Sequence, residues 1–132
     1  MTEDIIFGRA ENAKGGAVVI TSDGDVIYIN GLLPRGARII DALIKSDDLG
    51  TVGTLDLGWA AGSNGDEIAD PNGLINAMDV NAAANTVWAS DNLPNAAGIG
   101  KKFEEAVQLM VTASAATDAA GSFEVIVLYA ID

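Results

Sequence analysis

The segment that decides the fold is Phe123-Glu124-Val125-Ile126-Val127-Leu128-Tyr129-Ala130-Ile131. In an extended strand, successive side chains point to opposite faces, so the odd-numbered residues of this segment share one face. Both faces are apolar, because Glu124 is the only charged residue of the segment. A half-buried strand normally shows one polar face, so this pattern predicts a strand that is covered on both sides, by its own chain or by a neighbour.

Other segments earlier in the chain also predict strands. Ala17 to Thr21 and Val26 to Ile29 are rich in β-branched residues and flank Asp23-Gly24, which predicts a hairpin. Residues 37–45 are apolar on both faces, as in the last strand. Residues 51–59 instead alternate apolar and polar side chains, which is typical of a strand with one face in water.

The middle of the chain is less regular. Residues 60–69 are rich in Gly, Ser and Asn, which predicts a loop. Asp70-Pro71 is typical of a helix start, so we expect a short helix near 71–78. Residues 79–102 predict a long excursion with one short strand near 86–88.

The segment 103–113 fits two structures, because its apolar residues match the period of a strand and also one side of a helix. We favour a strand, since the segment 123–131 needs an antiparallel partner and a turn signal lies between the two. The prediction is a terminal hairpin.

Together these elements predict an all-β fold, an antiparallel β-sandwich of the jelly-roll-like kind with one short helix. Residues 1–16 have mixed polarity, with Ile5, Ile6 and Phe7 as an apolar anchor, and we expect them to form an N-terminal arm. Residues 17–132 are then a single sandwich domain, because a chain of 132 residues is long enough for one ordinary core.

The composition narrows the class of function. The chain has no cysteine and no histidine, which removes disulfides, thiolate sites and the commonest general base and zinc ligand. Seven basic residues stand against nineteen acidic ones, a formal net charge of -12, so no basic stripe is present to bind nucleic acid. No apolar run approaches about 18 residues and the N-terminus lacks the pattern of a signal peptide, so we expect a soluble chain made in the cytoplasm, without a membrane partner.

Catalysis and cofactors find little support in the sequence. Nucleophile-elbow, phosphate-loop and dinucleotide-binding motifs are missing, and a carboxylate pair of the glycosidase type would be unusual in so short and aromatic-poor a chain. We predict a protein that is not an enzyme and needs no cofactor. Asp66, Glu67 and Asp70, and also Asp47-Asp48, are weak candidates for a hard cation, but we favour turn and helix-cap roles for them.

Two tryptophans and two arginines are the remaining candidates for contact with a partner. Trp59 continues the apolar face of its strand, so we expect it in the core or at a subunit interface. Trp88 lies in the irregular segment and is the better candidate for stacking against a sugar ring. Arg35 and Arg38 are suited to pairing with acidic groups of a neighbouring subunit or to ordinary surface ion pairs.

Several motifs resemble those of small head proteins of tailed bacteriophages. They are Leu33-Pro34-Arg35-Gly36-Ala37-Arg38-Ile39-Ile40-Asp41, Asp47-Asp48-Leu49-Gly50, Gly53-Thr54-Leu55-Asp56-Leu57-Gly58 and the ending Phe123 to Asp132. Together they cover about residues 32–58 and 104–132. The chain thus resembles the capsid decoration, or cement, proteins, which have a jelly-roll-like β-sandwich and often form trimers on the outer shell.

This resemblance implies a structural virion protein on the outer capsid surface, made in the host cytoplasm. It also implies two partners, the major capsid protein and further copies of the chain in a homotrimer. The residues that we expect at such interfaces are Ile5, Ile6, Phe7, Arg35, Arg38, Trp59, Ile126 and Leu128.

Two other functions remain open from the sequence. One is a carbohydrate-binding β-sandwich module, for example a domain of a head fibre or a tail-associated adhesin, that uses Trp88 with Asp91 and Asn92. The other is an acidic mimic of DNA, which would need its carboxylates in rows with the spacing of phosphates. The scattered placement of the acidic residues counts against the mimic.

Overall fold

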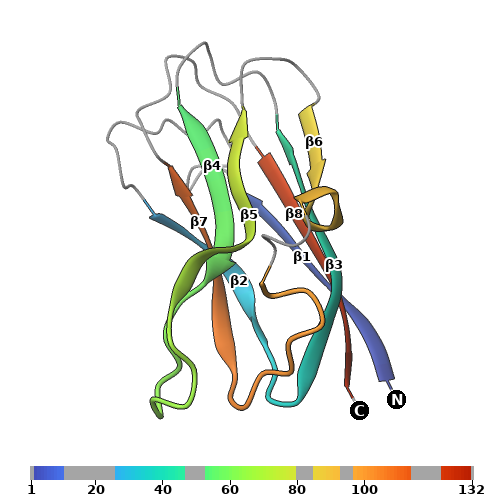
Figure 1. Ribbon diagram of the computed structural model, residues 1–132, viewed down its shortest axis with the longest axis vertical. Helices are drawn as coiled ribbons and strands as arrows, with labels where there is room; N and C mark the ends of the chain where they lie inside the picture. The colour runs from blue at the N-terminus through green and yellow to red at the C-terminus, as the bar shows by residue number, and fades with distance from the viewer. Residues whose placement is uncertain are drawn as a thin grey trace.

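The computed structural model describes residues 2–10, 26–46, 53–79, 85–92, 97–113 and 123–131. In these residues the chain forms eight strands and one short 3-10 helix, and two four-stranded antiparallel sheets face each other (Figure 1). The elements are β1 (Thr2–Ala10), β2 (Val26–Leu33), β3 (Ala37–Ser46), β4 (Thr54–Trp59), β5 (Asp70–Asp79), β6 (Asn85–Trp88), η1 (Ala89–Asn92), β7 (Val107–Ala113) and β8 (Phe123–Ile131). The predicted all-β sandwich is confirmed.

The strand pairing follows a nested rule. β4 pairs with β5, β3 with β6, β2 with β7 and β1 with β8, all antiparallel. The chain is thus a long antiparallel ribbon that doubles back on itself at the loop 60–69. Two further pairings, β3 with β8 and β4 with β7, close the sheets in the orders β1-β8-β3-β6 and β2-β7-β4-β5. This is the jelly-roll arrangement.

The core lies between the two sheets and is aliphatic, with few aromatic rings. In β8, Phe123, Val125 and Val127 are at most 1% exposed, while Ile126 and Leu128 on the opposite face are half-buried. β3 is buried at alternate positions in the same way, with a register shift between Ile39 and Asp41. The largest fully buried side chains are Phe103, Phe123, Ile29, Leu33, Ile39, Ile44, Leu55, Leu57, Leu74, Ile75 and Leu109.

Most of the predicted strands are confirmed. Residues 37–45 lie in β3, 51–59 overlap β4, and the short strand near 86–88 is β6. The ambiguous segment 103–113 contains β7, so the preference for a strand was right. For the predicted hairpin, residues 26–29 lie in β2, whereas residues 17–21 and the turn fall outside the described residues.

The helix expected near 71–78 is wrong, since Asp70–Asp79 forms strand β5. Pro71 is tolerated there because β5 is the edge strand of its sheet, where a missing backbone N–H breaks no ladder on the open side. The register shifts twice between β4 and β5, and Ala77 adopts a positive φ of 59°. Asp56 Oδ1 accepts a hydrogen bond of 2.6 Å from the Ala77 N–H and holds this bulge.

The expected terminal hairpin also differs from the structure. β7 and β8 lie in different sheets, so they form no terminal hairpin; β8 pairs with β1 and β3 instead. Residues 2–10, expected within an arm, form β1 and extend the sheet beside β8. The apolar last strand therefore takes a central place in its sheet. No helix in the described part of the chain is long and apolar enough to cross a membrane.

Substitution of Leu109 by alanine tests the position of the core. Leu109 is 0% exposed in β7, so the change should lower the free energy of unfolding by about 2–5 kcal/mol, through lost burial and the cavity left behind. The matched control is Leu32→Ala in β2, because Leu32 is 60% exposed and should change stability by less than about 0.5 kcal/mol. Urea unfolding measures both, and equal losses would contradict the described core.

Candidate functional site

The loop between β4 and β5 is held by a buried carboxylate. Glu105, which is 4% exposed, lies just before β7. Its Oε2 accepts a hydrogen bond from the Asn64 N–H at 2.8 Å, and its Oε1 accepts one from the Glu67 N–H at 2.9 Å. A Cβ atom on Gly62 would collide with this carboxylate, so any other residue at that position would force the Glu105 side chain to move.

The pKa of Glu105 reflects two opposing effects. Burial of the carboxyl raises the pKa, while hydrogen bonds from the backbone N–H groups of Asn64, Glu67, Asp66 and Gly65 lower it. The net effect is a pKa below the ordinary value of 4.5. Glu105 is therefore charged at neutral pH and fixes the loop through charge-assisted hydrogen bonds.

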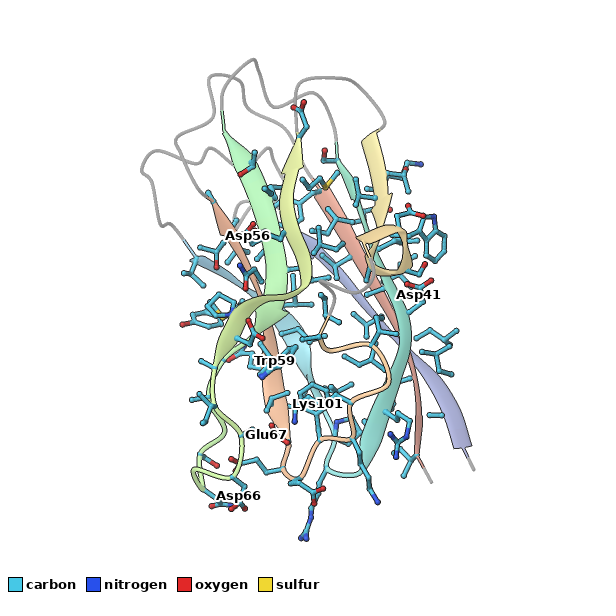
Figure 2. The ribbon with its side chains drawn as sticks, viewed as in Figure 1. Asp41, Asp56, Trp59, Asp66, Glu67 and Lys101 are labelled. Atoms are coloured by element: carbon cyan, nitrogen blue, oxygen red, sulfur yellow. The ribbon has the colours of Figure 1, made fainter. Side chains whose placement is uncertain are left out.

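A second buried carboxylate fixes the same loop from the other side. Glu67 is 4% exposed, and its Oε2 forms an ion pair of 2.8 Å with Lys101 Nζ. Its Oε1 accepts a hydrogen bond of 2.7 Å from the Glu104 N–H. The Lys101 ammonium also lies 4.8 Å from the centre of the Phe103 ring, within range of a cation–π interaction. Figure 2 shows Glu67, Lys101 and Trp59 close together at this end of the sandwich.

Trp59 ends β4 and forms the floor of the site. It is 3% exposed, and its ring packs edge-on against Phe103 at 5.0 Å between centroids with an angle of 87°. Its Nε1 donates a hydrogen bond of 3.0 Å to the Ile68 carbonyl oxygen. A Cβ atom on Gly73 or Gly98 would clash with the indole, so both glycines allow the backbone to approach the ring closely.

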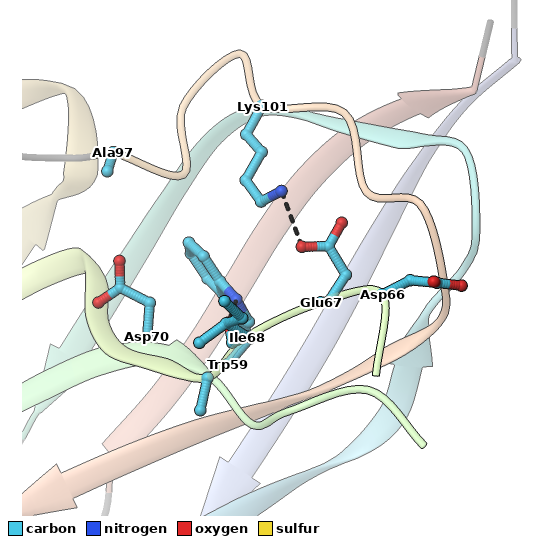
Figure 3. Close-up of a pocket in the computed structure, with 8 residues that line it drawn as sticks. Trp59, Asp66, Glu67, Ile68, Asp70, Ala97 and Lys101 are labelled. Atoms are coloured by element: carbon cyan, nitrogen blue, oxygen red, sulfur yellow. Dashed lines mark hydrogen bonds and ion pairs between the residues drawn. The ribbon is translucent and has the colours of Figure 1, made fainter. Parts of the chain in front are cut away.

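These residues surround a pocket of about 440 Å³ at the surface (Figure 3). Ile68 stands at its margin and is 83% exposed, although its backbone carbonyl is held by Trp59. The residues that line the pocket are Trp59, Asp66, Glu67, Ile68, Ala69, Asp70, Ala97 and Lys101.

The weak metal candidates do not come together as a ligand set. Glu67 is engaged with Lys101, Asp66 is exposed, and Asp70 is half-buried at the start of β5. In the part of the chain that the structure describes, no group of three or more acidic side chains is placed to hold a metal ion. Asp47 and Asp48 lie outside the described residues. The chemistry of the pocket is therefore that of a shaped, acidic and partly apolar surface.

A second candidate surface is the outer face of the sheet that contains β8. The register places Ile126 between Phe7 of β1 and Leu43 of β3, and Leu43 in turn opposite Trp88 of β6. This is an apolar row across all four strands. In the neighbouring row, Leu128 pairs with Asp41. Residues directly opposite each other in antiparallel strands share a face, so the two rows together form one stripe, which is apolar except at Asp41.

Exposure along this stripe differs from residue to residue. Trp88 is 44% exposed, and Leu43, Ile126 and Leu128 are half-buried. Ile40, in the same strand as Leu43, is also 44% exposed. Within the described residues nothing of the chain packs these side chains into the core. The stripe is a candidate contact surface.

The other residues predicted at interfaces lie in different parts of the fold. By register, Ile5 and Phe7 pair with Leu128 and Ile126, whereas Ile6 pairs with Val127, which is buried in the core. The interface role of Ile5, Ile6 and Phe7 stays a prediction. Trp59 belongs to the core cluster, which is one of the two places expected for it.

The two arginines lie near the turn from β2 to β3. Arg35 is exposed in this turn, and Arg38 is exposed in β3, where its guanidinium donates a hydrogen bond to the Gly100 carbonyl oxygen. Trp88 and Asp91, proposed for sugar binding, are in contact, because the backbone N–H of Trp88 donates a hydrogen bond of 3.3 Å to Asp91 Oδ2. The side chain of Asn92 is not among those described.

Three residues of the site were missed by sequence reasoning, namely Glu105, Lys101 and Ile68. The available signal was the run Gly62-Ser63-Asn64-Gly65, since a glycine-rich loop presents backbone N–H groups that need acceptors. A glutamate at the start of an apolar strand is a candidate acceptor, but its partner lies about forty residues away in the chain. The pairing follows only from the fold.

Comparison with known proteins gives two structural neighbours. A chain in the capsid of Ralstonia phage GP4 matches 98% of this chain and 85% of its own length, with a TM-score of 0.67 and 26% sequence identity. A chain of the cyanophage Pam1 capsid asymmetric unit matches the same shares of both chains, with a TM-score of 0.67 and 18% identity. No family model and no curated protein matches the sequence. The chain therefore shares its fold with chains of phage capsids.

Glu105→Gln tests the buried carboxylate that holds the loop. A carboxyl whose pKa is lower in the folded state stabilises the fold above its ordinary value of 4.5, and this stabilisation disappears as the pH falls through the folded-state pKa. The variant should melt at a lower temperature than the wild type at pH 7, and the difference should shrink on acidification below about pH 4.5.

The control is Glu104→Gln, because Glu104 is the exposed neighbour in the chain. Its melting temperature should match that of the wild type across the pH range. A pH-independent deficit in Glu105→Gln would contradict the role of its charge.

Proposed function

We propose that this chain is a capsid decoration, or cement, protein that binds the outer surface of a phage head as a homotrimer and stabilises the shell. The observation that carries the proposal is the fold match over 98% of the chain to a chain of the Ralstonia phage GP4 capsid. The resemblance of the strand and turn motifs to decoration proteins supports the finer assignment. The proposed partners are the major capsid protein and further copies of the chain.

The proposed mechanism is burial of surface across the seams between shell subunits. A protein that binds only the assembled shell stabilises the shell by mass action. Each contact can be weak, because three linked copies raise the effective concentration of the second and third contacts once the first has formed. A rigid sandwich suits this role, since little conformational entropy is lost when it binds.

For the contact between copies, we propose the apolar stripe on the outer face of the β1-β8-β3-β6 sheet. Ile126 and Leu128 lie at its centre, and Trp88 and Ile40 are each 44% exposed. An apolar stripe that its own chain leaves only half-buried or exposed, on a chain with a net charge of -12, is a typical interface feature. Burial of this stripe by a sister subunit would cover the second face of β8.

A structural role also fits the chemistry of the described residues. The buried carboxylates Glu67 and Glu105 are both engaged in holding the loop 62–67, and the sequence lacks nucleophile-elbow, phosphate-loop and dinucleotide-binding motifs. We therefore propose a protein that is not an enzyme.

A carbohydrate-binding module is the second candidate function. Trp88 favours it, because this residue is 44% exposed and its backbone N–H donates a hydrogen bond to the side chain of Asp91. Flat aromatic faces with a nearby carboxylate are suited to sugar rings. This reading differs from the decoration role in its expected solution state, a monomer that binds oligosaccharide.

Native mass and binding to heads test the proposal directly. The purified chain should have the mass of three copies in multi-angle light scattering and should co-sediment with empty heads assembled from the major capsid protein of the same phage. Decorated heads should melt at a higher temperature than undecorated heads. A monomer whose tryptophan fluorescence is quenched by oligosaccharide, with no binding to heads, would favour the carbohydrate-binding module instead.

Leu128→Asp tests the proposed contact between copies. A charge in the middle of the apolar stripe would be buried without a partner in the assembled trimer, so the native mass should fall to that of one copy. Circular dichroism should stay that of a β-sandwich, because Leu128 faces away from the core.

Tyr28→Asp is the control for that experiment. Tyr28 is 54% exposed and belongs to the opposite sheet, so this variant should keep the wild-type mass. If Tyr28→Asp dissociates the oligomer and Leu128→Asp does not, the contact lies on the other sheet.

A further inference from the structure

Ile68 is the most exposed large apolar side chain in the described part of the chain. It is 83% exposed, compared with 60% for Leu32 and 54% for Tyr28. Isolated exposed apolar residues are ordinary on protein surfaces. Ile68 differs from an ordinary surface residue in the way that its backbone is held.

Buried groups fix the backbone on both sides of Ile68. The preceding residue, Glu67, donates its N–H to Glu105 and places its side chain against Lys101. The carbonyl oxygen of Ile68 itself accepts the hydrogen bond from Trp59 Nε1. Isoleucine is β-branched, so its χ1 angle is also restricted. The side chain is therefore presented in water at a fixed position.

An exposed but ordered side chain such as that of Ile68 is better suited to binding a partner than to stabilising its own fold. Ile68 has little of its surface covered by its own chain, so it contributes little to the stability of the sandwich. A side chain that is already ordered loses little entropy when a partner covers it, which is the advantage of a preorganised contact. The pocket of about 440 Å³ beside Ile68 offers space for a side chain of that partner (Figure 3).

The charge around the pocket indicates the chemistry of the partner. Asp66, Glu67 and Asp70 line it together with Lys101, so three carboxylates stand against one ammonium. Lys101 is already paired with Glu67, which leaves the carboxylates of Asp66 and Asp70 to set the sign of the surface. A second copy of the chain that docked here through the same surface would bring these carboxylates against their equivalents. A basic partner is complementary.

We infer that Ile68 and the pocket beside it are the site at which the chain docks on the shell, and that the occupant is a segment of the major capsid protein carrying an apolar side chain next to a lysine or arginine. The apolar side chain packs on Ile68 within the pocket, and the cation pairs with Asp66 and Asp70. This inference rests on the proposed decoration function. It assigns the shell contact to the loop end of the sandwich and leaves the sheet face to the contact between copies.

The test is a titration of the protein onto empty heads assembled without it, with the bound protein measured after sedimentation. Ile68→Ser should weaken binding about tenfold or more, as expected for an anchor residue at the centre of a contact. Its melting temperature and native mass should match the wild type, because Ile68 packs on little in its own chain. Leu32→Ser is the matched control, since Leu32 is also exposed and should keep wild-type binding.

Asp66→Asn tests the charge separately. This variant should bind more weakly than the wild type at low salt, and the difference should shrink as the salt concentration rises, because exposed charge pairs are screened. Equal binding by Ile68→Ser and the wild type would overturn the inference while leaving the decoration function in place. Loss of the oligomer in Ile68→Ser would also overturn it, since the loop would then be a contact between copies. If the wild-type protein does not bind heads, the decoration function itself fails.

Discussion

The turn from β4 to β5 is the constraint on which the rest of the sandwich depends. All four nested pairings, from β4 with β5 outward to β1 with β8, require the chain to double back at the loop 60–69. The inner pair closes a short loop, whereas the outer pair joins strands from opposite ends of the described chain. The entropy lost on closing a loop rises with the length of chain that the loop encloses. Pairing β4 with β5 therefore loses the least entropy, and this pair brings the outer strands into alignment. Glu105 and Glu67 fix this loop with buried charge.

The two-faced apolar pattern of the last strand has a specific cause in this topology. β8 lies between β1 and β3, so its backbone is paired on both edges and its odd-numbered residues fill the core. The even-numbered residues then meet the outer face of the sheet, where Ile126 and Leu128 are half-buried. A sandwich has only one interior, so its own fold covers one face of each strand. The second apolar face needs another molecule or remains partly in water.

Sequence reasoning identified the strands that alternate clearly and failed where tertiary context overrides local signals. Asp70-Pro71 has the pattern of a helix start, yet β4 offers an open edge and the Trp59 ring requires the glycine at position 73. The hairpin expected between 103–113 and 123–131 assumed that neighbours in sequence pair with each other. In this jelly roll, consecutive strands other than β4 and β5 lie in different sheets, so β7 and β8 have other partners. A pattern of side chains determines which face of a strand is buried, but not which strand lies beside it.

The same limit explains what was missed at the candidate site. The side-chain contacts of Glu105 and Glu67 that hold the loop join residues far apart in the chain, such as Asn64 with Glu105 and Glu67 with Lys101, and no local spacing marks them. The sequence did single out Glu67, Asp66 and Asp70, but as cation ligands, because clustered carboxylates are typical of such sites. The fold gives Glu67 an internal cation instead, and the ammonium of Lys101 neutralises it. The groups that hold the loop are thus buried and satisfied within the chain, while Ile68, Asp66 and Asp70 remain at the surface. If the proposed docking holds, different residues of one short segment carry the stability of the loop and the contact with the shell, so either can be altered without the other.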